Sequence, residues 1–142
     1  LQSDPAVATG ASANEPLNEI FAMSDITGDT TFNISVNGVA GIIKVPPGNY
    51  VGGTLAAALE TRINQISSPS TGVAVGGVKV AYIAATNNFT FTTGTTRDTS
   101  TIKVKGASRL GLDDVALGVG SVPQITNLVQ ATNADGVPLY VD

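Results

Sequence analysis

The chain has 142 residues, of which 42% are hydrophobic but only 5% are aromatic, and its formal net charge is −4. This length fits one domain with a core of Val, Ile, Leu and Ala. The chain contains no Cys and no His, which excludes disulfides, thiolate nucleophiles, imidazole catalysis and zinc sites built on these residues.

The acidic balance, with scattered Lys and Arg, argues against nucleic acid as a partner. No apolar run approaches the roughly 20 residues that span a bilayer, so we expect no membrane insertion. The nearest basic cluster is Lys103, Lys105 and Arg109. Because the two lysines alternate along an expected strand, we interpret the cluster as a solvated face.

Residues 1–16 (LQSDPAVATGASANEP) are small and turn-forming and show no periodicity. This composition is typical of a linker or a loosely attached lead-in. We therefore expect a single β-rich domain over residues 17–142. Residues 17–26 (LNEIFAMSDI) fit either a strand or a helical turn. The chain starts at Leu1 without a signal-like segment, and we expect it to be a piece of a longer protein.

The clearest element is a β-hairpin over residues 31–45 (TFNISVNGVAGIIKV). Apolar residues in its first half alternate with polar ones, as in a strand with one buried face. Asn37-Gly38 follows, and both residues tolerate the positive φ angles of a two-residue type I′ turn. The Pro-Pro-Gly sequence at 46–48 ends the second strand, because proline cannot donate a ladder hydrogen bond.

A short amphipathic helix is expected at about residues 54–66. Its apolar face is formed by Leu55, Leu59, Ile63 and Ile66, which recur at helical spacing. Thr54 is a candidate N-cap, Glu60 and Arg62 point to the other side, and the apolar face is expected to pack on the hairpin. Asn64 near the helix end is expected to hydrogen-bond free carbonyls or loop amides, which is a structural role.

The remaining elements alternate strands and turns. They are strands at 78–83, 89–93 and 101–105, a turn at Asn87-Asn88, a polar loop at 93–101, a turn at Leu110-Gly111-Leu112 that buries two leucines, and a final hairpin at 125–141 closed near Asp135-Gly136. The connections are too short for parallel crossovers. The expected fold class is therefore α+β, mostly antiparallel β with one short amphipathic helix.

The span 31–112 resembles the flagellin hook IN motif, which recurs in bacterial flagellar axial proteins. The pieces stand in the family's order: a hairpin of the FNISVNG type, a proline-containing bend, a Leu/Ala-rich helix with an Ile-Asn pair, an FTFTT strand and a Leu-Gly-Leu. The residues that match this motif are Leu55, Leu59, Ile63, Asn64, Leu110 and Leu112.

The resemblance implies a structural, non-catalytic domain of a hook protein, a hook-associated protein or a flagellin. Such a domain is secreted, lies on the surface of the assembled flagellum, serves motility, and has neighbouring copies of the same protein as partners. No cofactor is implied, and the isolated domain is expected to be monomeric. The family's long terminal helices with heptad spacing are not recognisable in residues 1–30 or 113–142, which implies an outer or central domain.

A β-rich module of a bacterial adhesin or phage tail protein, binding a surface ligand, is the alternative interpretation. Such modules share the Thr/Gly/Val-rich, acidic and cysteine-poor composition of this chain. The Thr-rich loop at 93–101 fits a solvated connection, and an O-glycosylated patch of the kind that some flagellar filaments carry is the alternative there.

No residue pattern predicts catalysis. Asp113-Asp114 and the pair Asp25 and Asp29 lack a partnering base or nucleophile. Residues 133–136 (NADG) resemble part of a calcium loop but lack its further acidic ligands. The GxG within 117–121 (LGVGS) is not followed by a helix, and Pro123 favours a loop there.

Overall fold

The computed structural model describes residues 3–26, 28–68, 72 and 74–122. The hairpin expected at 125–141, with Asp135-Gly136, and the sequence at 133–136 lie outside the described residues. In chain order the elements are β1 (Val7–Thr9), β2 (Phe21–Met23), β3 (Thr31–Val36), β4 (Val39–Lys44), β5 (Gly48–Tyr50), α1 (Gly52–Ile63), β6 (Lys79–Ile83), β7 (Asn88–Thr92), β8 (Thr101–Lys105), a 3-10 helix η1 (Ser108–Leu110) and β9 (Gly118–Val119).

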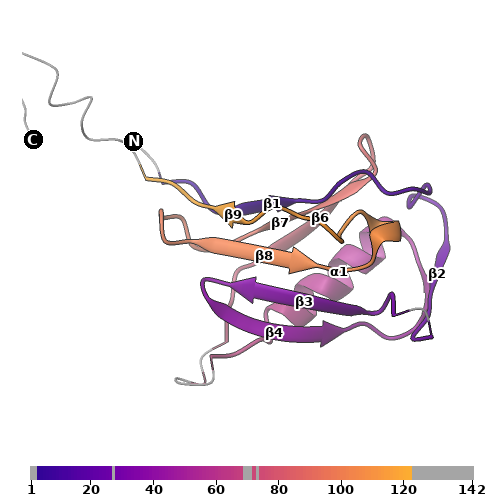
Figure 1. The fold of residues 1–142 in the computed structure, drawn as a ribbon, viewed down its shortest axis with the longest axis horizontal. Helices are drawn as coiled ribbons and strands as arrows, with labels where there is room; N and C mark the ends of the chain where they lie inside the picture. Colours follow the sequence, from indigo (N-terminus) through magenta and orange to yellow (C-terminus); the bar gives the residue numbers. More distant parts are fainter. Residues whose placement is uncertain (1–2, 27, 69–71, 73, 123–142) are drawn as a thin grey trace, which may run out of the picture.

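The strands form two larger sheets and one small ribbon, all with antiparallel pairing. One sheet has the strand order β1-β7-β6, the other has the order β4-β3-β8-β9, and β2 pairs with β5. β1 also lies against β8 and β9, and α1 packs on β6 and, less extensively, on β4 and β5 (Figure 1). The expected fold class, α+β and mostly antiparallel β with one helix, is confirmed.

The core lies between the two sheets and the helix. Its largest fully buried side chains are Phe32, Phe89, Phe91, Leu17, Leu55, Leu59, Ile63, Ile102, Leu110, Leu112, Val36 and Val45. Strands β3, β7 and β8 turn their alternate apolar residues to this core, as the period-two pattern predicts. The leucines and isoleucine of the helix face the same core.

The hairpin at β3 and β4 is confirmed in register and in turn type. Val36 pairs with Val39 across a two-residue turn, and φ is +52° at Asn37 and +85° at Gly38. These positive angles match the right-handed twist of the flanking strands. Residues 17–26, which fitted two structures, contain the short strand β2.

The helix begins two residues earlier and ends three residues earlier than expected. Val51 is the N-cap, and Thr54 occupies the third helical position, so its assignment as N-cap is wrong. The Thr54 hydroxyl instead accepts the N–H of Val51 at 2.9 Å. Gly52 is the first helical residue, and the absence of a side chain there makes room for the ring of Tyr82, because a Cβ would lie 2.4 Å from it.

The interpretation of residues 1–16 as a loosely attached lead-in is wrong. Residues 7–9 form β1, which pairs with β7 over three residues. Ala6 and Ala8 are buried, and the N–H of Gly10 donates to the carbonyl of Phe89 at 2.8 Å. The segment packs closely on the C-terminal part of the domain, where a Cβ at Gly118 would lie 2.4 Å from the carbonyl oxygen of Val7.

Candidate functional site

The Ile-Asn pair lies at the end of α1, and its two side chains have different roles. Ile63 is fully buried. The Oδ1 of Asn64 accepts the N–H of Val78 at 2.9 Å, and its Nδ2 donates to the carbonyl of Val78 at 3.0 Å. The side-chain amide thus offers Val78, just before β6, the donor and acceptor that a neighbouring strand would offer.

Two further helix side chains contact strand backbones on either side of α1. The Oε1 of Glu60 accepts the N–H of Val80 in β6 at 2.9 Å. The Nε of Arg62 donates to the carbonyl of Lys44 at the end of β4 at 2.9 Å. The expectation that Glu60 and Arg62 point away from the sheets is therefore wrong, because both side chains bind outward backbone groups at strand edges.

We expect Asn64→Leu to lower the free energy of unfolding by about 1–3 kcal/mol, because the buried N–H and C=O of Val78 lose their partners while the side chain keeps its branching and its number of heavy atoms. Urea unfolding followed by circular dichroism measures this change. Asn49→Leu, at an exposed position of β5, is the matched control, with an expected change of no more than about 0.5 kcal/mol. Equal values for the two variants would show that the side-chain amide contributes nothing.

The Leu-Gly-Leu sequence forms the turn that was expected to bury two leucines. Leu110 and Leu112 are fully buried, and Gly111 between them has a φ of +73°. A Cβ at Gly111 would lie 2.0 Å from the carbonyl oxygen of Ala11. Glycine is therefore required both by the backbone conformation and by the close approach of the N-terminal segment.

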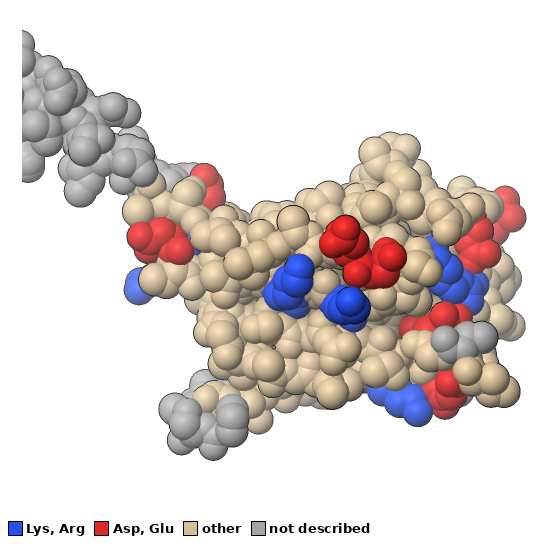
Figure 2. All heavy atoms as spheres, viewed as in Figure 1, with Lys and Arg blue, Asp and Glu red and all other residues tan. Residues whose placement is uncertain are grey.

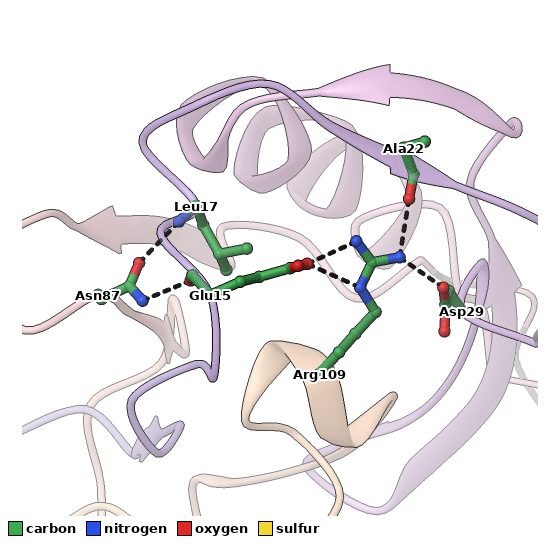
Figure 3. A network of polar contacts seen from close by, with 6 residues as sticks. All are labelled: Glu15, Leu17, Ala22, Asp29, Asn87 and Arg109. Atoms are coloured by element: carbon green, nitrogen blue, oxygen red, sulfur yellow. Dashed lines mark hydrogen bonds and ion pairs between the residues drawn. The ribbon is translucent and has the colours of Figure 1, made fainter.

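Arg109, one residue before this turn, is the centre of the polar network in Figure 3. Its Nε donates to Glu15 Oε1 at 3.0 Å and its Nη2 to the same oxygen at 2.5 Å. Its Nη1 donates to Asp29 Oδ2 and to the carbonyl of Ala22, both at 2.8 Å. One guanidinium therefore joins η1 to the N-terminal segment, to β2 and to the turn before β3.

The surroundings of Arg109 keep it charged. The pKa of Arg109 is raised, first by the hydrogen bond to Asp29 and then, against its partial burial, by the bond to Glu15. The guanidinium carbon also lies 5.7 Å from the centre of the Phe21 ring, a cation–π distance. Arg109 is therefore not part of a solvated basic face, although Lys103 and Lys105 are exposed on β8 as expected.

Asn87 fixes the N-terminal segment from the other side (Figure 3). It has a φ of +53° in the turn between β6 and β7. Its Oδ1 accepts the N–H of Leu17 at 3.0 Å and the hydroxyl of Tyr82 at 2.5 Å, while its Nδ2 donates to the carbonyl of Glu15 at 2.7 Å. Together, Asn87 and Arg109 hold the segment that leads into the buried Leu17.

The carboxylate pairs are not brought together into a site. Asp29 belongs to the Arg109 network, whereas Asp25 accepts the Thr30 hydroxyl at 2.5 Å and lies 3.4 Å from Lys44 Nζ. The bond from Thr30, followed by the contact with Lys44, lowers the pKa of Asp25. Asp113 and Asp114 are exposed. Within the described ranges no group of three or more acidic residues is placed to hold a metal ion.

The GxG sequence is part of strand packing, so the expectation of a loop there is wrong. Gly118 lies in β9, where a Cβ would be 2.4 Å from the carbonyl oxygen of Val7. A Cβ at Gly120 would be 2.3 Å from the carbonyl oxygen of Arg97. The nearby Thr-rich loop is mostly exposed, but its first residue, Thr93, is buried and accepts the N–H of Ala6 at 2.9 Å.

The sequence interpretation missed three residues that organise these contacts, namely Glu60, Asn87 and Arg109. Glu60 binds Val80, which lies 20 residues away in the sequence. Asn87 binds Leu17 and Arg109 binds Glu15, which lie 70 and 94 residues away. One signal was available for Asn87: it precedes a strand at a turn position, where asparagine tolerates positive φ.

Comparisons with known proteins give no relative: no family model, no curated protein and no solved structure matches the chain. In the part of the chain that the structure describes, α1 is 12 residues long, and no helix has the length and apolar character needed to cross a bilayer.

Proposed function

We propose that the chain is a structural, non-catalytic domain of a bacterial flagellar axial protein, exposed on the surface of the assembled tube. The parent is a hook protein, a hook-associated protein or a flagellin, and its partners are neighbouring copies of itself. The proposal starts from the resemblance of residues 31–112 to the IN motif. It is supported by how the motif residues are used, because Ile63, Leu110 and Leu112 are fully buried.

The observation that carries the proposal is the pairing of Asp4 with Ser121. The N–H of Asp4 donates to the carbonyl of Ser121 at 2.8 Å, and the N–H of Ser121 donates back at 3.2 Å. Polypeptide that continued before Asp4 and after Ser121 would therefore enter and leave the domain at the same place. η1 lies toward the opposite end of the ribbon from β9 (Figure 1). We take this arrangement as support for a domain that projects from a shaft.

Strongly held polar side chains also favour a structural role. Asn64, Asn87, Arg109 and Asp29 each have protein partners at hydrogen-bond distance. Residues used in this way fix backbone segments relative to one another. Fixed relative positions of this kind suit a subunit of a repeating assembly, which must present the same shape in every copy.

The proposal is tested by the sequence that flanks this domain in the intact parent protein. We expect about two to four heptads of apolar spacing on each side, because tube-forming axial proteins assemble through such helices. Mass spectrometry of the terminal peptides of the parent provides the measurement. Tandem β-modules or a cell-wall anchor in their place would refute the proposal and favour the adhesin or phage-tail interpretation.

A further inference from the structure

At the outer edge of β4, the residues that the structure describes leave the backbone groups of Ala40 and Ile42 without a strand partner. Val36 and Val39 flank the two-residue turn of the hairpin, and pairs in that position exchange both hydrogen bonds. The backbone groups of residues 40, 42 and 44 therefore point away from β3. The carbonyl of Lys44 confirms this direction, because it accepts the Nε of Arg62.

The helix closes the corresponding edge of β6 but leaves this one free. On β6 the side chains of Glu60 and Asn64 occupy the outward backbone groups of Val80 and Val78. On β4 only the carbonyl of Lys44 is occupied, and the strand pairings and hydrogen bonds of the described residues give Ala40 and Ile42 no partner on this side. Unpaired edge groups of this kind are a template for another strand.

Two hollows meet at this open edge. One, of about 480 Å³, lies between β4 and the end of α1 and is lined by Arg62, Gln65 and Ser67. The other, of about 640 Å³, lies on the outer face of the sheet beside Ile42. Both share the stretch 40–42. The side chain of Ile42 is 73% exposed, although it is a large apolar group in a strand.

The side chains around the edge set the charge of a partner. Arg62 and Lys44 line the first hollow and the lysines of β8 line the second, and the described lining residues of the two hollows include no carboxylate. Figure 2 shows a largely uncharged face over β3 and β4, with basic groups beside an acidic pair over β8. Of the two cations that line the first hollow, Lys44 is contacted by Asp25. The described hydrogen-bond partners of Arg62 are backbone carbonyls and include no carboxylate.

We propose that the edge of β4 binds an extended acidic segment of a different polypeptide by strand addition. Alternate side chains of an added strand point to opposite faces. One set would therefore cover Ile42 and should be apolar, and the other would face Arg62 and should carry carboxylates. A second copy of β4 (VAGIIK) has no carboxylate and would bring Lys44 to a basic groove. This inference does not depend on the assignment to a flagellar protein.

The test uses the ¹⁵N-labelled 142-residue chain and two synthetic peptides of eight residues. One peptide alternates valine with glutamate, and the other alternates valine with lysine. We expect the glutamate peptide to give saturable shifts centred on the amides of Ala40 and Ile42, with Kd below about 1 mM. Their hydrogen exchange should slow, because the added strand occupies those N–H groups. The lysine peptide should give no saturable shift.

Matched variants locate the site. Ile42→Glu should abolish binding of the glutamate peptide, whereas Ile20→Glu, at a position 75% exposed in the segment before β2, should leave binding unchanged. Arg62→Gln should weaken binding about three- to tenfold, and Lys79→Gln on β6 should not.

Four outcomes overturn the proposal: equal binding of both peptides, no saturable shift up to about 1 mM peptide, shifts centred elsewhere, or protection of Ala40 and Ile42 by self-association. Self-association is detected as a mass that rises with chain concentration in light scattering, and it would identify a second copy as the occupant.

Discussion

Ile63→Ala is expected to lower the free energy of unfolding by about 2–5 kcal/mol, the range for truncation of a fully buried isoleucine. Ile63 lies at the end of α1, directly before the residue that binds Val78. A cavity there should therefore loosen the contact between the helix and β6 as well as remove apolar contacts. Urea unfolding curves, compared at constant m value, measure the change.

Two companion variants decide whether burial is the cause. Ile63→Val should lose only about 0.5–1.5 kcal/mol, because one methylene group is removed. Ile26→Ala, at a position that is 96% exposed, should change stability by no more than about 0.5 kcal/mol. A loss for Ile63→Ala that does not exceed the loss for Ile26→Ala would contradict the packing role of the motif.

Local patterns explain which parts of the fold could be predicted. The hairpin depends on strand alternation and on Asn37-Gly38, which are adjacent in sequence, and α1 depends on apolar spacing within 12 residues. Both signals lie inside the element that they specify. The same holds for the turn at Leu110-Gly111-Leu112, where glycine between two leucines indicates a change of direction with burial on both sides.

Contacts between distant segments explain what could not be predicted. β1 has three residues, which is too short for a period to be recognised, and its small side chains resemble those of a linker. Its position depends on Gly118 and Gly120, more than 100 residues away, which let the backbones approach. Without the fold, these glycines are indistinguishable from loop glycines, and the GxG sequence suggested a loop.

The contacts of Arg109 also join segments that are far apart in the sequence, so its role could not be predicted. We expect its removal to destabilise the protein about as much as Ile63→Ala does. Arg109→Ala should lower the free energy of unfolding by about 2–4 kcal/mol, somewhat below the range for a fully buried pair because the guanidinium is partly exposed. The substitution leaves the Asp29 carboxylate, whose side chain is only 11% exposed, without its cation. The carbonyl of Ala22 also loses its donor.

A double-mutant cycle separates the unpaired charge from the lost packing. If the carboxylate causes the loss, Asp29→Asn in the Arg109→Ala background should recover about 1 kcal/mol or more, whereas Asp29→Asn alone should destabilise the protein. Arg109→Lys should fall between wild type and Arg109→Ala, because lysine keeps the charge but not the fork that reaches Glu15 and Asp29 together.

The exposed Arg97, in the Thr-rich loop, is the matched control, and Arg97→Ala should change stability by no more than about 0.5 kcal/mol. Two results together would contradict this role: the effects of Arg109→Ala and Asp29→Asn on the free energy of unfolding add strictly, and Arg109→Ala costs no more stability than Arg97→Ala. They would mean that β2 and the N-terminal segment are held in place without the guanidinium. If the cycle instead shows coupling, a single side chain of η1 fixes segments that lie 80 to 94 residues earlier in the chain. In that case the end of the domain remote from Asp4 and Ser121 is stabilised by a polar network, and the hydrophobic core between the sheets is not its sole support.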